Sequence, residues 1–137
     1  MFNFRLSDKM ERMDGLPADI DLKPIIGREV TMVRLGKFQL HYLLSDEKPT
    51  RPDAWIEIES NDLTFTDASG NATKISDFIQ GAGQLCLLVG LKIEKATRKD
   101  DGGLHLNMST GIQLDINIHT SMYESVVLHV GEDATVG

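Results

Sequence analysis

An internal sequence repeat is the feature that most constrains how this chain can fold. Residues 22–34 and 85–97 carry apolar side chains and one glycine at the same spacing. An offset of 63 residues superposes Gly27 on Gly90. Self-similarity at a fixed offset indicates a repeated structural unit, so we expect two similar halves.

The repeat continues downstream. After one inserted residue, Leu40-His41-Tyr42 matches Leu104-His105-Leu106, and Trp55–Glu59 then matches Gly111–Asp115. A chain of 137 residues is the length of one ordinary domain. The prediction is a single domain over residues 1–137, with internal repeats at about 22–70 and 85–130.

Each half is expected to begin with a short apolar turn or helix that ends at a glycine, which suits the left-handed position closing a helix. Strands should follow, because apolar and polar residues then alternate with a period of two. The predicted strands are Glu29–Leu35, Phe38–Leu44, Trp55–Glu59, Leu63–Thr66, Lys92–Arg98, Gly103–Met108, Ile112–His119 and Ser125–Val130.

Between the halves, Ser76 is placed to cap a helix that runs from Asp77 towards Leu88. Gly81 and Gly83 weaken this helix by about 1 kcal/mol each, so it should be short or irregular. The predicted fold is mainly β, α+β at the margin, with two antiparallel β-rich halves and one or two short helices.

One hairpin can be assigned in register. Its loop, Ser109-Thr110-Gly111, places a glycine where a positive φ is needed. The core face then carries the pairs Leu104–Ile116, Leu106–Leu114 and Met108–Ile112, and the polar face carries His105–Asp115 and Asn107–Gln113. A slip by one residue would mix the two faces and is disfavoured.

Composition excludes several classes. The net charge of −7 argues against nucleic-acid binding, and no apolar run is long enough to cross a membrane. The lone Cys86 cannot form an internal disulfide, which fits a reducing, cytoplasmic location. Because Cys86 lies in the apolar run Leu85–Val89, we expect it to be buried.

The strongest catalytic candidate is the pair His105–Asp115, since a carboxylate can orient a histidine that acts as a general base. The register places no nucleophile beside it, because Ser109 and Ser121 lie in turns. The histidines show no metal-binding spacing, so no metal or cofactor is expected. An ordinary cross-strand pair is the favoured interpretation.

Polar side chains that share a strand face form the candidate binding surface. If the halves pack symmetrically, the two rows would make one acidic surface, with Trp55 as an aromatic anchor. The alternative is a solvated sheet face with Trp55 in the core. The candidate partner-binding residues are Trp55, Glu57, Glu59, His105, Gln113, Asp115, Asn117 and His119.

The repeated pattern Ile/Val-Gly-x-x-Val/Ile and the final Tyr123-Glu124-Ser125-Val126 resemble a family of small, uncharacterised, two-repeat β-rich bacterial proteins. These are similar to the immunity proteins of polymorphic or contact-dependent toxin systems. The resemblance covers residues 22–130, and the loop at 45–53 and the first twenty residues depart from it. It carries no catalytic residues.

The resemblance implies a non-enzymatic protein that neutralises a toxin domain by direct binding, with an acidic face that steers onto a basic partner. The expected partner is a protein, not nucleic acid or membrane, and no oligomeric state is specified. The alternative is a small enzyme or ligand-binding protein that uses His105 and Asp115 in a cleft between the halves.

Overall fold

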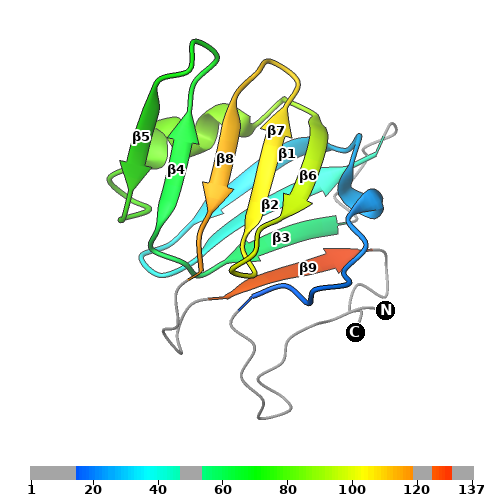
Figure 1. Ribbon diagram of the computed structural model, residues 1–137. Coiled ribbons are helices and arrows are strands. Elements are labelled where there is room, and N and C mark those ends of the chain that lie inside the picture. The colour runs from blue at the N-terminus through cyan, green and yellow to red at the C-terminus, as the bar shows by residue number, and fades with distance from the viewer. Residues whose placement is uncertain (1–14, 47–53, 119–124, 131–137) are drawn as a thin grey trace.

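The computed structural model describes residues 15–46, 54–118 and 125–130, which form two antiparallel sheets packed face to face (Figure 1). Sheet 1 has the order β1 (Glu29–Leu35), β2 (Leu40–Ser45), β3 (Ala54–Ile58), β9 (Val126–Val130). Sheet 2 has the order β5 (Ala72–Ile75), β4 (Leu63–Thr66), β8 (Gln113–Ile116), β7 (Leu104–Met108), β6 (Ile93–Arg98). The helical segments are η2 (Lys23–Ile25), α1 (Ala82–Leu85) and η3 (Cys86–Leu88). The predicted class, a mainly β single domain with short helices, is confirmed.

The two halves exchange their fourth strands. Strands β1, β2 and β3 follow one another in sheet 1, and the next strand, β4, pairs with β8 in sheet 2. In the same way β6, β7 and β8 build sheet 2, and β9 pairs with β3 in sheet 1. Each sheet therefore contains strands from both halves, and the inward faces share one hydrophobic core.

A short backbone joint connects the halves. Gly27 N–H donates to the Ile93 carbonyl at 2.7 Å, and Gly90 N–H donates to the Val30 carbonyl at 2.7 Å. The two glycines have φ of 91° and 94°, and a bulge follows Val30 in β1 and Ile93 in β6. The halves thus share their element order, their glycine conformation and their bulge. That they arose as copies of one unit stays a prediction.

The sequence match between the third strands differs from the structure by two residues. Leu40, the first residue of β2, faces Ile58, and Leu104, the first residue of β7, faces Ile116. Glu57 is therefore equivalent to Asp115, whereas the sequence match paired it with Gln113. A strand pattern has a period of two, so it matches itself equally well after a shift of two residues.

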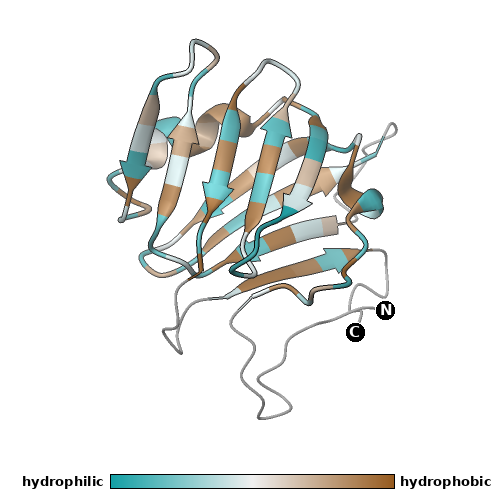
Figure 2. Cartoon of the chain, viewed as in Figure 1, coloured by the Kyte–Doolittle hydropathy of each residue, from teal (hydrophilic) through white to brown (hydrophobic). Residues whose placement is uncertain are grey.

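The hairpin of β7 and β8 has the predicted register. Leu104 faces Ile116, Leu106 faces Leu114 and His105 faces Asp115. Gly111 has φ of 94°, and its N–H donates to the Met108 carbonyl at 3.0 Å. Figure 2 shows apolar and polar bands alternating along the strands of sheet 2. The apolar side chains of this hairpin are buried, apart from the half-buried Ile112.

Two predictions about residues 76–89 are wrong. Ser76 caps no helix: α1 begins at Ala82, and its N-cap residue, Gly81, provides no side-chain hydrogen bond. Asp77 holds the turn before the helix, where its Oδ1 accepts from the N–H groups of Ile79 at 2.9 Å and Gln80 at 3.1 Å. Cys86 is exposed, because Leu85 and Leu88 point into the core and the residues between them on a helical turn face outward.

Strand β5 was missed because its first three residues are exposed and lack an apolar alternation. A turn at Asp67 reverses the chain so that β5 can pair with β4. Asp67 Oδ1 accepts from the N–H groups of Asn71 and Ser69, each at 2.9 Å. These hydrogen bonds, led by that of Asn71, hold the pKa of Asp67 below its ordinary value. Gly70 completes the turn with φ of 94°.

Two further expectations concern the irregular segments of the chain and the absence of a membrane-spanning segment. The greater part of the proline-containing loop and the tail after Val130 lie outside the described residues. Within the described ranges, no helix is long and apolar enough to span a bilayer.

Replacing Leu106 with Ala should lower the free energy of unfolding by about 2–5 kcal/mol, because it leaves a cavity between buried strands. Urea denaturation followed by circular dichroism measures this. Thr97→Ala, on the outward face of the same sheet, is the control and should change stability by less than about 0.5 kcal/mol. A loss under ~1 kcal/mol for Leu106→Ala would mean that the core tolerates the cavity.

The glycine joint between the halves predicts that two glycine substitutions will differ in their effect on stability. Gly90→Ala should destabilise the protein by about 1–2 kcal/mol, since a side chain strains a residue at φ of 94°. Gly83→Ala is the matched control: its added Cβ also meets nothing within 4 Å, and it lies in α1, where Ala is favoured by up to about 1 kcal/mol. Equal effects of the two substitutions in thermal unfolding would contradict the proposed role of the glycine.

Candidate functional site

The outward side of sheet 2 carries polar side chains across all five strands. Cross-strand pairing puts them in rows, because directly opposed residues share a face. One row contains Lys74, Thr64, Asp115, His105 and Thr97. We call this surface, together with Asp62, Lys99, Asn107, Gln113 and Asn117, the sheet-2 face.

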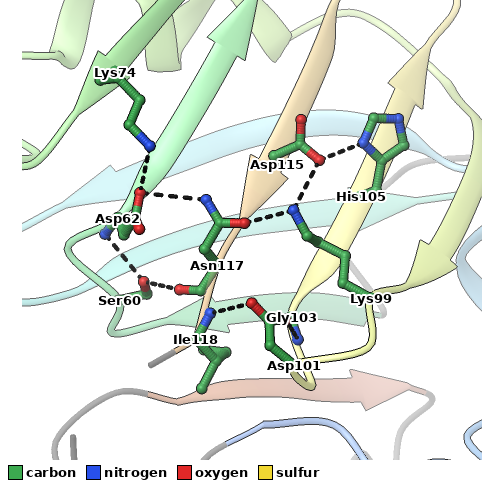
Figure 3. Close-up of polar contacts among 10 residues, drawn as sticks. All are labelled: Ser60, Asp62, Lys74, Lys99, Asp101, Gly103, His105, Asp115, Asn117 and Ile118. Carbon is green, nitrogen blue, oxygen red and sulfur yellow. Dashed lines mark hydrogen bonds and ion pairs between the residues drawn. The ribbon is translucent and has the colours of Figure 1, made fainter. Parts of the chain in front are cut away.

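Asp115 joins His105 and Lys99 in a hydrogen-bonded network (Figure 3). Its Oδ1 contacts His105 Nδ1 at 2.6 Å and Lys99 Nζ at 3.3 Å. Lys99 Nζ also donates to Asn117 Oδ1. The ammonium group of Lys99 thus bridges the Asp115 carboxylate and the Asn117 side-chain amide.

The network continues to the opposite edge of the sheet. Asp62 Oδ1 accepts from Lys74 Nζ at 3.0 Å and from Asn117 Nδ2 at 3.3 Å. Ser60 Oγ donates to the Asn117 carbonyl and accepts from the Asp62 N–H at 3.1 Å. Contacts therefore run without a break from Lys74 to His105, through side chains from both halves.

These contacts balance the charge of the surface. Asp115 is paired with Lys99, and Asp62 is paired with Lys74. Opposite charges at such distances cancel each other's field beyond a few ångströms of water and salt. The expected acidic row is therefore replaced on sheet 2 by a neutralised, hydrogen-bonded one.

The outward side of sheet 1 carries a different cluster. His129 Nε2 hydrogen-bonds to Glu57 Oε1, and the His129 ring stacks on Trp55 with centroids 4.5 Å apart and planes 15° apart. His41 Nε2 lies 3.8 Å from Glu57 Oε2. His129 is only 6% exposed. Trp55 is therefore half-buried against a histidine on the outward face, not in the core between the sheets.

The predicted binding residues do not form one surface. Trp55 and Glu57 face outward from sheet 1, whereas the other half's row faces outward from sheet 2, on the opposite side of the core. Glu59 follows β3 and accepts from Gln39 Nε2 at 2.9 Å and Ser125 Oγ at 3.3 Å. The residues gathered on the sheet-2 face are His105, Gln113, Asp115 and Asn117, and His119 lies outside the described residues.

The His105–Asp115 pair forms as the register predicted, but it lies on an open sheet face. The pair does not lie in a cleft between the halves, because the strands of the two halves pack around one shared core. None of its hydrogen bonds in the described part of the chain involves a serine or cysteine. Within the same residues, no group of three histidine, cysteine or acidic side chains is arranged to hold a metal ion.

Sequence reasoning missed Ser60 and three charged members of the network. Lys99 could have been found, because it lies two residues after Thr97 and a strand face repeats every two residues. Asp62 and Lys74 could not, since they join the surface only through the pairing of β4 with β8 and β5.

Comparisons with known proteins provide one match. A model described as "Family of unknown function (DUF6188)" matches residues 21–129. No curated protein and no solved structure matches the chain.

The two lysines of the network should differ in their effect on stability. Lys99→Met should cost about 1–2 kcal/mol, because it leaves Asn117 Oδ1 without its donor and removes the cation paired with the half-buried Asp115. Lys74→Met is the matched control: Lys74 is 71% exposed, and surface ion pairs contribute about 0–1 kcal/mol. Urea unfolding at neutral pH measures both variants. A Lys74→Met loss as large as that of Lys99→Met would contradict the ranking.

Proposed function

The chain belongs to the DUF6188 family of unknown function, and from its geometry we propose that it is a non-enzymatic binding protein. In finer terms, it is an immunity protein that neutralises a bacterial toxin domain by direct contact through the sheet-2 face. The observation that carries the proposal is the continuous polar network from Lys74 to His105.

A prearranged polar surface favours binding to another protein. Side chains that already hold one another lose little conformational freedom on association, which reduces the entropy cost of about 0.5–1.5 kcal/mol for each long side chain. Protein interfaces carry many direct hydrogen bonds, whereas small-molecule sites are concave and mostly apolar. A row of amides, hydroxyls and paired charges on a sheet suits the first of these.

The resemblance to small two-repeat bacterial proteins, which are similar to immunity proteins, supports a toxin domain as the partner. Such a protein would act stoichiometrically: it would occupy the toxin's active site or substrate path and would turn over nothing itself. The charge pairing on the sheet-2 face favours recognition by short-range hydrogen bonds over long-range steering by net charge.

The alternative function is a small enzyme that uses His105 as a base. The hydrogen bond to Asp115 favours it, because this geometry orients an imidazole. A base alone supplies only part of a reaction, and within the described residues no serine or cysteine hydrogen-bonds to the His105–Asp115 pair.

Co-expression with the toxin domain encoded by a neighbouring gene tests the proposal. Cells that produce the toxin domain should survive only when this chain is present, and native mass spectrometry should show a one-to-one complex. Replacing both Asn107 and Gln113 with Ala should weaken binding at least about tenfold, as loss of two interfacial hydrogen bonds does. Lys37→Ala, in the exposed turn after β1, is the control and should leave affinity unchanged.

Two outcomes would contradict the proposal. One is toxicity that persists although both proteins are folded and present. The other is a hydrolytic activity of the purified chain that is lost in His105→Ala, which would favour the enzyme.

A further inference from the structure

We propose that His105 is the recognition residue of the sheet-2 face, and that its Nε2 atom accepts a hydrogen bond from a lysine or arginine side chain of the partner. This inference rests on the proposed function and specifies the chemistry by which the partner is held.

The contacts of Asp115 set the tautomer of His105. A carboxylate that also receives the ammonium group of Lys99 is ionised and can only accept hydrogen bonds. The 2.6 Å contact with His105 Nδ1 therefore requires the proton on Nδ1. In a neutral imidazole the other nitrogen, Nε2, then carries a lone pair and acts as an acceptor.

This acceptor is available. No described residue hydrogen-bonds to His105 Nε2, and the side chain is 25% exposed. The histidine at the equivalent position of the other half differs: His41 Nε2 is the atom nearest Glu57, and it is buried. His129 is also buried, with its Nε2 on Glu57. Among the three described histidines, only His105 has an Nε2 atom that is neither buried nor hydrogen-bonded to a carboxylate.

The surroundings favour a cationic donor. Asp115 accepts the hydrogen bond of His105 Nδ1, so Nε2 keeps its lone pair free to accept from a partner. The net charge of −7 means that a basic group of the partner meets no net repulsion from the chain as a whole. Lysine and arginine have several N–H donors and no acceptor, so they match a surface atom that can only accept.

The tautomer can be tested without any partner. Long-range ¹H–¹⁵N correlation spectra of the ¹⁵N-labelled chain at pH 8 should show His105 with its proton on Nδ1 and an unprotonated Nε2. Asp115→Asn should reduce this preference, since an amide can donate as well as accept. A proton on Nε2 in the wild-type chain would overturn the inference.

Three substitutions at one position test recognition by the toxin domain. His105→Asn keeps a donor at the Nδ1 position but removes the Nε2 acceptor, so affinity should fall about 10–100-fold, as for a hydrogen bond to a charged group. His105→Gln can extend an amide oxygen to the Nε2 position and should bind within about threefold of wild type. His105→Lys should bind more weakly than His105→Asn, because like charges then meet.

Isothermal titration calorimetry measures these affinities, and urea unfolding of each variant checks that the fold is kept. If wild type fails to bind, the proposed function fails. If wild type binds and His105→Asn binds equally well, only this inference fails. Binding of His105→Lys as strong as that of His105→Asn, or stronger, would overturn the assignment of a cationic partner group.

Discussion

The reciprocal hydrogen bonds between Gly27 and Ile93 and between Gly90 and Val30 are the constraint on which the rest of the architecture depends. They bring the first strand of one half against the first strand of the other, at the one place where the two sheets meet edge to edge through a backbone bridge in the described chain. Both glycines need a positive φ to present their N–H groups there. Because β1 and β6 meet at this joint, the strands that follow them, β2–β3 and β7–β8, are added on the opposite side of each sheet.

The exchange of β4 and β9 then converts two weak units into one domain. A three-stranded meander exposes one apolar face, and neither sheet gains its fourth strand without the other half. Strand β4 also brings Asp62 beside Asn117, so the polar network contains residues from both halves. The same exchange that completes the core therefore completes the candidate binding surface.

The two halves place a histidine and a carboxylate at equivalent positions but use them differently. His105 and Asp115 form a direct bond on an accessible face. In the other half, His129 from the exchanged strand binds Glu57, and His41 remains 3.8 Å away. The two halves thus carry one outward-facing pair and one largely buried cluster, and in the second of these the carboxylate bonds to a histidine on the exchanged strand.

Periodicity in the sequence determined the eight predicted strands, the glycine that ends each opening turn, and the His105–Asp115 hairpin register. These depend on neighbours within one hairpin, where alternation and turn geometry suffice. Tertiary structure decided the exposure of Cys86, the presence of β5, and the roles of Asp62 and Lys74. Asp62 joins the surface through the pairing of β4 with β8, which are far apart in the chain. A pattern with a period of two specifies which face a residue takes but not which strand it meets. Strand β5 depends on side-chain hydrogen bonds in the Asp67 turn, and the exposure of Cys86 depends on which side of a helical turn packs on the core, and neither is set by strand alternation.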